Sequence, residues 1–202
     1  MLSLGNVVSD FAAGLAAADA KRPVFTSRTG RIYQAGIGPH GEDRAVELTI
    51  AEMRTAHPER YTAIGQGLQY PNSKQRCDVW IGEPVTWVLE IKMARFFGDN
   101  GKPDDTSLKD LLSPFDLHRS ALTDAQKLAA STLPGRRAVL IYGFTYPRMP
   151  LELAIEAFEV LARARVSLGP RASAPLGALV HPVHAQGAVF GWEVLGYHAK
   201  QK

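Results

Sequence analysis

Residues 74–95 read KQRCDVWIGEPVTWVLEIKMAR, and this stretch decides the fold that we expect for the chain. Apolar and polar residues alternate on both sides of residues 82–84, which is typical of two strands joined by a tight turn. Side chains alternate between the faces of a sheet, so Asp78, Glu90 and Lys92 are expected on one face. Two carboxylates beside a lysine suit a hard divalent cation held against a phosphate. The plainer interpretation is a solvated cross-strand charge cluster, which is ordinary on sheets.

This arrangement resembles the PD-(D/E)xK nuclease superfamily, also called restriction endonuclease-like. The resemblance rests on Asp78, an eleven-residue gap and then Glu90, Ile91 and Lys92, with Cys77 in place of the family's proline. It implies that Asp78, Glu90 and Lys92 are catalytic. It also implies Mg²⁺, replaceable by Mn²⁺, bound by Asp78, Glu90 and the backbone carbonyl of Ile91. Lys92 is then expected to orient or deprotonate the attacking water.

The resemblance implies further site residues on two predicted helices. Glu47 is our candidate for an additional catalytic acid on the helix before the first strand, although a surface helix acid explains it equally well. We assign Glu42, in the first turn, to the helix dipole. Gln126 and Lys127 are candidates for nucleic-acid contacts on the helix after the lysine-bearing strand, and their plainer interpretation is exposed helix residues.

The rest of the chain predicts an α/β fold around this hairpin. The expected helices cover residues 3–18, 42–56, 121–132 and 151–165, and further strands cover residues 24–26, 31–33, 61–70, 137–144, 178–180 and 188–195. This order contains the αβββαβ core of the restriction endonuclease-like fold, with a mixed central sheet flanked by helices. We expect a single domain over residues 1–202, with the helix and hairpin of residues 1–35 and the strand pair of residues 176–197 as elaborations.

A long polar connection, residues 96–119, follows the lysine-bearing strand. Such connections in compact domains are usually functional or mobile. We interpret it as a flap that closes over nucleic acid, with Lys102 and Lys109 contacting phosphates. An ordinary surface loop or a dimer interface are the alternatives, and four acids weaken the electrostatic argument: Asp99, Asp104, Asp105 and Asp110.

Two other groups of residues have structural interpretations. His181 and His184 look like a metal-binding pair, but no cysteine or acid is near them in the sequence, so we interpret them as loop histidines. Trp80 shares the acidic face and either stacks on a base or packs under a helix. Trp87 and Trp192 are expected in the core.

Composition limits the function classes. The chain has 202 residues, 46% of them hydrophobic and 21% charged, as in ordinary soluble domains. It has one cysteine, no apolar run long enough for a membrane span and no basic region before its N-terminal apolar segment, so we expect a cytoplasmic protein. The net charge of +3 permits a polyanionic partner.

These observations together predict a metal-dependent nuclease that acts on DNA, with an endonuclease favoured over an exonuclease. A homodimer, or a partner subunit in a defence or repair system, is expected by analogy with small relatives of the superfamily. The alternatives are a non-cleaving nucleic-acid-binding or assembly module on the same fold, and an unrelated α/β protein in which the motif is accidental.

Overall fold

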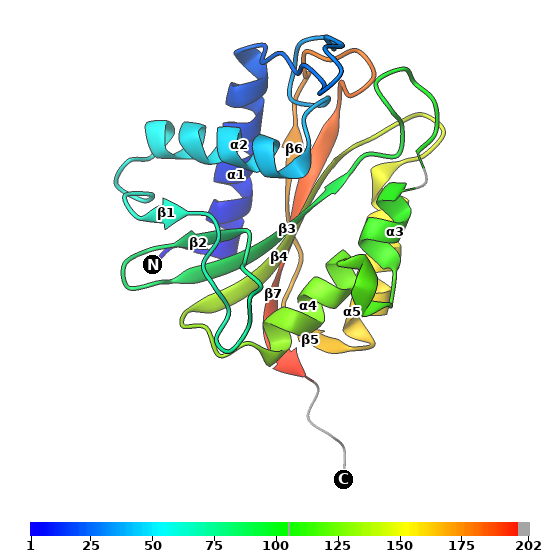
Figure 1. The fold of residues 1–202 in the computed structure, drawn as a ribbon. Coiled ribbons are helices and arrows are strands. Elements are labelled where there is room, and N and C mark those ends of the chain that lie inside the picture. Colours follow the sequence, from blue (N-terminus) through cyan, green and yellow to red (C-terminus); the bar gives the residue numbers. More distant parts are fainter. Residues whose placement is uncertain (105, 198–202) are drawn as a thin grey trace.

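The computed structural model describes residues 1–104 and 106–197, so Asp105 of the expected flap lies outside the described residues. Within these residues a mixed seven-stranded sheet has the order β1-β2-β3-β4-β7-β5, and β6 also pairs with β7 (Figure 1). The strands are β1 (Ile64–Gly65), β2 (Val79–Ile81), β3 (Trp87–Ala94), β4 (Arg136–Phe144), β5 (Val166–Leu168), β6 (Ala172–Leu176) and β7 (Gly187–Tyr197). The predicted α/β class with a mixed sheet flanked by helices is confirmed.

The lysine-bearing strand β3 is central in this sheet. It pairs antiparallel with β2 and parallel with β4, and β4 pairs antiparallel with β7. Glu90 lies opposite Val139 and Lys92 opposite Ile141, so both charged residues belong to the face that carries these apolar side chains of β4. Glu90 and Lys92 are therefore fixed on a strand that is paired on both sides and buried except at Lys92 and Met93, which are half-buried.

Helices cover both faces of the sheet. They are α1 (Leu4–Ala20), α2 (Glu42–Ala56), α3 (Thr106–Leu112), α4 (Ala121–Ala130) and α5 (Leu151–Arg163). Helices α1 and α2 lie to one side of the sheet, and α3, α4 and α5 lie to the other (Figure 1). The ring of Phe11 on α1 is 5.8 Å from that of Tyr142, and Phe158 on α5 is 5.1 Å from Trp192. Trp192 is fully buried, as predicted, and so is Trp87.

Helix α1 approaches the sheet closely at Gly191 of β7. A Cβ atom at Gly191 would lie 2.7 Å from Cγ2 of Val8, closer than packed carbon atoms come. The missing side chain of this glycine thus sets the spacing between α1 and the sheet.

A predicted strand and a predicted hairpin in the first 70 residues are shorter than expected. The strand expected over residues 61–70 is confined to β1. Gly67 has a φ of 76°, which interrupts the extended backbone, although its N–H still donates to the Cys77 oxygen at 3.1 Å and Gln69 forms a bridge with Arg76. The hairpin expected at residues 24–33 is a single bridge between Thr26 and Ile32.

The expected loop over residues 96–119 is wrong where α3 and a 3₁₀ turn, η1 (Asp116–His118), form. Leu111 of α3 is fully buried, and the Ser107 hydroxyl donates to the backbone oxygen of Arg95 at 2.6 Å and accepts from its N–H at 3.1 Å. The helix is short and polar, so packing rather than sequence pattern defines it.

The C-terminal strand pair is also shifted. Its first strand is β6, where a loop was expected, and residues 178–180 form a loop. Asp19 of α1 accepts a hydrogen bond from the Val180 N–H at 2.6 Å, which diverts that backbone from the sheet. Residues 172–176 form the strand β6 in place of residues 178–180, and they pack against α1.

Candidate active site

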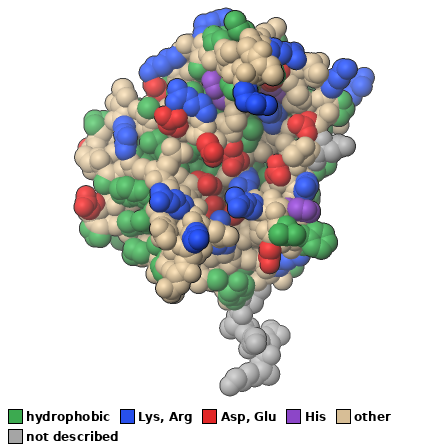
Figure 2. Space-filling view, viewed as in Figure 1, with side chains coloured by type: hydrophobic (Ala, Val, Ile, Leu, Met, Phe, Trp, Pro, Cys, Tyr) green, Lys and Arg blue, Asp and Glu red, His purple; other side chains and the backbone are tan. Residues whose placement is uncertain are grey.

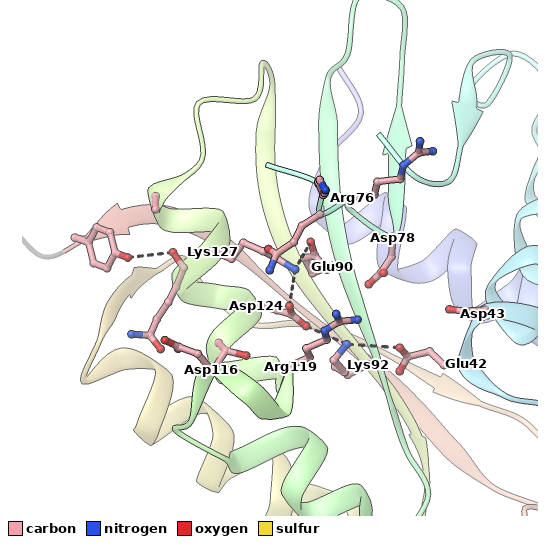
Figure 3. A pocket seen from close by; sticks show the side chains of 16 residues that line it. Glu42, Asp43, Arg76, Asp78, Glu90, Lys92, Asp116, Arg119, Asp124 and Lys127 are labelled. Atoms are coloured by element: carbon pink, nitrogen blue, oxygen red, sulfur yellow. Dashed lines mark hydrogen bonds and ion pairs between the residues drawn. The ribbon is translucent and has the colours of Figure 1, made fainter. Parts of the chain in front are cut away.

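A cleft of about 990 Å³ opens between β3, the start of α2 and helix α4. Asp78, Glu90 and Lys92, the three residues of the predicted motif, all line it (Figure 3). Asp78 precedes the first residue of β2, so the predicted strand begins one residue later than its acid. The prediction that these three side chains share one face is nevertheless matched by their positions.

Two carboxylates accept hydrogen bonds along the part of β3 that β2 leaves unpaired. Strand β2 is short, so the N–H groups of Ile91 and Met93 have no β2 residue to pair with. Asp78 Oδ2 accepts from the Ile91 N–H at 2.6 Å, and Glu42 Oε2 accepts from the Met93 N–H at 2.5 Å. These bonds satisfy buried donors and fix both carboxyl groups beside the cleft.

Lys92 lies between three oxygen groups on the floor of the cleft. Its Nζ is 3.0 Å from Asp124 Oδ2, 3.6 Å from Glu42 Oε1 and 3.5 Å from the Ile91 carbonyl oxygen. Burial lowers the pKa of Lys92, but Asp124 and Glu42 outweigh it, so the pKa is raised overall. The ammonium is therefore charged at neutral pH.

Glu90 is the deepest acid of the cluster, with 2% of its side chain exposed. Its Oε1 accepts from the Tyr70 hydroxyl at 2.5 Å and lies 3.0 Å from Lys127 Nζ. Lys127 also contacts Asp124, one helical turn before it on α4, at 2.7 Å. The second ammonium of the site thus joins α4 to β3.

Burial controls the protonation of the acids. It raises the pKa of Glu90 to about 8, with the charges of Asp124 and Asp78 acting in the same direction. It raises the pKa of Glu42 to about 7, opposed by Lys92 and by the Met93 N–H. The pKa of Asp78 is also raised by burial, and the Ile91 N–H bond opposes this rise. At pH 7 the cluster accordingly retains protons that exposed carboxyls would have lost.

Basic side chains border the acidic centre. Figure 2 shows acidic groups gathered in the middle of this face with lysine and arginine side chains around them. Lys74, Arg76 and Arg119 line the cleft together with Lys127. A second hollow of about 330 Å³ shares Glu42, Lys92 and Arg119 with the first, so the acidic cluster lies where two hollows meet.

Several predicted site residues lie elsewhere. Glu47 is exposed on α2 and pairs with Arg44 at 2.6 Å, and it does not line the cleft, whereas Glu42 of the same helix does. Lys102 and Lys109 are exposed and line neither hollow. Gln126 and Lys127 do line the cleft. Trp80 packs against Gly65, where an added Cβ would lie 2.9 Å from its ring, and it does not line the cleft.

Sequence reasoning missed Asp124 and Tyr70. Asp124 is 3% exposed on α4 and contacts both lysines of the cluster. Its position three residues before Lys127 was a usable signal, since residues at this spacing share a helix face. Tyr70 reaches Glu90 from the loop after β1, and no local pattern marks it.

A second group of possible metal ligands lies away from the cleft. Asp99, His181 and His184 have ligand atoms within 4.8 Å of one another, and this group could hold a metal ion. The expectation that no acid lies near the histidines is wrong, because Asp99 Oδ1 is 2.9 Å from His184 Nε2. Across residues 1–104 and 106–197, no other three His, Cys, Asp or Glu side chains meet this criterion.

Comparisons of the chain with protein-family models, with curated proteins and with solved structures find no match. None of the helices within the described ranges is both long and apolar enough to cross a membrane.

Proposed function

We propose that this chain is a metal-dependent nuclease that hydrolyses phosphodiester bonds in DNA, on a restriction endonuclease-like αβββαβ core. The observation that carries the proposal is the convergence of Asp78, Glu90 and Lys92 on the floor of one cleft. Their order and spacing along the chain are those of the PD-(D/E)xK motif.

The charges of the cluster suit a divalent cation. Its four carboxyls and two ammonium groups leave two negative charges when all are ionised, which one divalent ion would neutralise. The groups are Glu42, Asp78, Glu90, Asp124, Lys92 and Lys127. Asp78 and Glu90 offer the hard oxygen donors that Mg²⁺ and Mn²⁺ prefer, and the Ile91 carbonyl oxygen lies 3.5 Å from Lys92 Nζ. A bound ion would supply Lewis-acid activation of a phosphoryl oxygen and acidification of water.

The surroundings of Lys92 define its part in the reaction. Its raised pKa makes it a poor acceptor of a proton at neutral pH, so it fits orientation of water and neutralisation of phosphate charge better than general-base catalysis. Asp124 and Glu42 hold its ammonium in place. Of the two roles that the sequence allows for Lys92, we therefore favour orientation of the attacking water over its deprotonation.

The rim of the cleft suits a polyanion. Lys74, Arg76 and Arg119 place positive charge around the acidic centre, where phosphates on either side of a scissile bond would lie. The second hollow extends the site beyond Lys92 and Arg119, as binding of a polymer requires.

A specific observation favours a second function, a nucleic-acid-binding or assembly module that does not cleave. The two lysines pair with Glu42, Glu90 and Asp124 directly, so the cluster is neutralised in part without a cation. Such pairing is sufficient for a structural network.

The cation dependence of cleavage separates the two functions. Duplex DNA, single-stranded DNA and RNA should each be incubated with the protein in Mg²⁺, in Ca²⁺ and in excess chelator. We expect DNA cleavage in Mg²⁺, binding without cleavage in Ca²⁺, and no cleavage in chelator. Lys92→Gln should abolish cleavage, and Lys109→Gln, the same change on exposed α3, should not. Binding without cleavage in Mg²⁺ and Mn²⁺ would favour the non-cleaving module.

A further inference from the structure

Three side chains from distant parts of the chain meet behind the end of β3. Asp99 comes from the turn at residues 96–104, and His181 and His184 come from the loop before β7. Asp99 Oδ1 is 2.9 Å from His184 Nε2, and the two imidazole rings stack with centroids 4.7 Å apart. Residues so far apart in sequence come together only through the fold.

The histidines are buried and incompletely satisfied. His181 is 1% exposed and His184 is fully buried. The Nε2 atom of His181 has no hydrogen-bond partner among the described side chains and backbone. A buried polar atom without a partner costs stability, so a ligand at this nitrogen would remove a defect of the fold. The Val183 N–H contacts Nδ1 of His181 at 3.3 Å, a weak bond that is easily given up when the ring proton moves to Nδ1.

His184 is oriented as a metal ligand is. The Tyr146 hydroxyl lies 2.8 Å from His184 Nδ1, on the opposite side of the ring from Asp99. An outer hydrogen bond of this kind fixes the ring and directs the other nitrogen toward a metal. Gly38 leaves room for the ring, since a Cβ there would lie 2.5 Å from His184 Cδ2. Burial lowers the pKa of His184 to about 4 and also lowers that of His181, so both rings offer lone pairs at neutral pH.

We propose that Asp99, His181 and His184 form a Zn²⁺ site that braces the chain leaving β3 against the loop before β7. Two imidazole nitrogens and one carboxylate oxygen are a donor set that Zn²⁺ takes, with water as a fourth ligand. Mg²⁺ prefers an all-oxygen set, so this site differs in chemistry from the acidic cleft. Zinc bonds of about 2.0–2.1 Å in a tetrahedron separate ligand atoms by about 3.3 Å, and the Asp99–His184 pair needs to open by only a few tenths of an ångström.

The consequence of the site is mechanical. Asp99 follows Lys92 by a short connection, and Phe97 in that connection packs on Tyr146 with ring centroids 4.6 Å apart. A cation held by Asp99 and the two histidines would tie this connection to the β7 side of the sheet. The inference does not depend on the proposed nuclease activity.

The test is zinc binding by the full chain after chelator treatment and dialysis. Equilibrium dialysis with metal analysis should give one Zn²⁺ per chain, and Zn²⁺ at about 100 times its Kd should raise Tm by about 5–10 °C. Asp99→Asn and His181→Gln should each lose the bound ion and the Tm rise. His57→Gln, which changes another histidine paired with an aspartate, Asp10, should retain both.

Two further measurements distinguish loss of the zinc site from misfolding of a variant and from zinc binding in the acidic cleft. Co²⁺ should give the visible absorption of a four-coordinate ion in the parent chain, a signal that does not depend on any variant folding. A cleft variant carrying Asp78→Asn and Glu90→Gln should still bind one Zn²⁺. No stoichiometric Zn²⁺ on the parent chain would overturn the proposal. Zn²⁺ binding that is lost in the cleft variant and kept in Asp99→Asn would overturn it as well.

Discussion

Replacing Glu90 by Gln tests whether burial holds a proton in the cleft. Glu90 has 2% of its side chain exposed, and burial together with Asp124 and Asp78 raises its pKa to about 8 from an ordinary 4.5. At Glu90 the folded protein therefore holds more protons than the unfolded chain between these values, so the contribution of this residue to stability falls as pH rises through this window. A pKa raised from 4.5 to about 8 corresponds to roughly 5 kcal/mol of unfolding free energy contributed by Glu90 at low pH.

Other titratable groups set the pH range in which this effect can be measured. Glu42, with its pKa raised to about 7, acts in the same sense as Glu90. The raised pKa of Lys92 and of Lys127 stabilises the fold throughout this window, because an unfolded lysine loses its proton only near pH 10.5. The lowered pKa of the buried His40, His181 and His184 acts in the opposite sense, because stability then rises with pH up to about 6.5, where an unfolded histidine loses its proton. The slope between pH 6.5 and pH 8.5 thus reports on the acids.

Urea unfolding followed by tryptophan fluorescence, in chelator at pH 5, 6, 6.5, 7 and 8.5, measures the slope. The parent should lose stability as pH rises from 6.5 to 8.5, and Glu90→Gln should remove most of that loss, so the variant overtakes the parent at pH 8.5. Glu47→Gln, the same substitution on exposed α2, should follow the parent curve. Mg²⁺ should stabilise the parent more at pH 8.5 than at pH 6. Parallel curves for the parent and Glu90→Gln would refute the buried-proton argument.

Two other predictions concern the site and its rim. Glu42→Gln should lower the cleavage rate by about 10-fold or more, since it loosens the Met93 and Lys92 contacts, whereas Glu47→Gln should leave it unchanged; equal rates for both in single-turnover assays would remove Glu42 from the site. Arg76→Ala should reduce the slope of log affinity against log salt by about 1, because it removes a cation that lines the cleft, and Lys102→Ala and Lys109→Ala should not; a fluorescence-anisotropy salt series that reversed this order would restore the flap hypothesis.

The sequence predicted the elements whose pattern is local and strong. Strand β4 is a long apolar run and α2 has a clear helical period, and the predicted range of α2 agrees with its observed bounds. Sequence did not predict strands β5 and β6 or helix α3, because each is short and exists through contact with other elements. Local propensity carries little information about such segments.

The residues of the candidate site also divide into those that a local sequence pattern predicts and those that depend on packing. Asp78, Glu90 and Lys92 could be placed on one face because strand alternation is local. Glu47 follows the buried Val46 directly, but adjacent helix residues point about 100° apart, so Glu47 faces solvent. The place of Asp124 in the site depends on how α4 packs on β3, and no local sequence pattern predicts that packing.

The cluster of Asp99, His181 and His184 could not be predicted from local sequence. No acid lies beside His181 and His184 along the chain, because Asp99 is far away in sequence. The contact arises only when the turn after β3 meets the loop before β7.

The central claim is tested most directly by single-turnover cleavage of duplex DNA in Mg²⁺ by the parent, Asp78→Asn, Glu90→Gln and Lys92→Gln. Circular dichroism should first show that each variant is folded. The account predicts cleavage by the parent and rates lowered by about 10²–10⁴-fold in each variant, with DNA binding in Ca²⁺ retained. Folded variants that cleave as fast as the parent, or a parent that binds DNA and never cleaves it, would contradict the assignment of this cleft as a nuclease site.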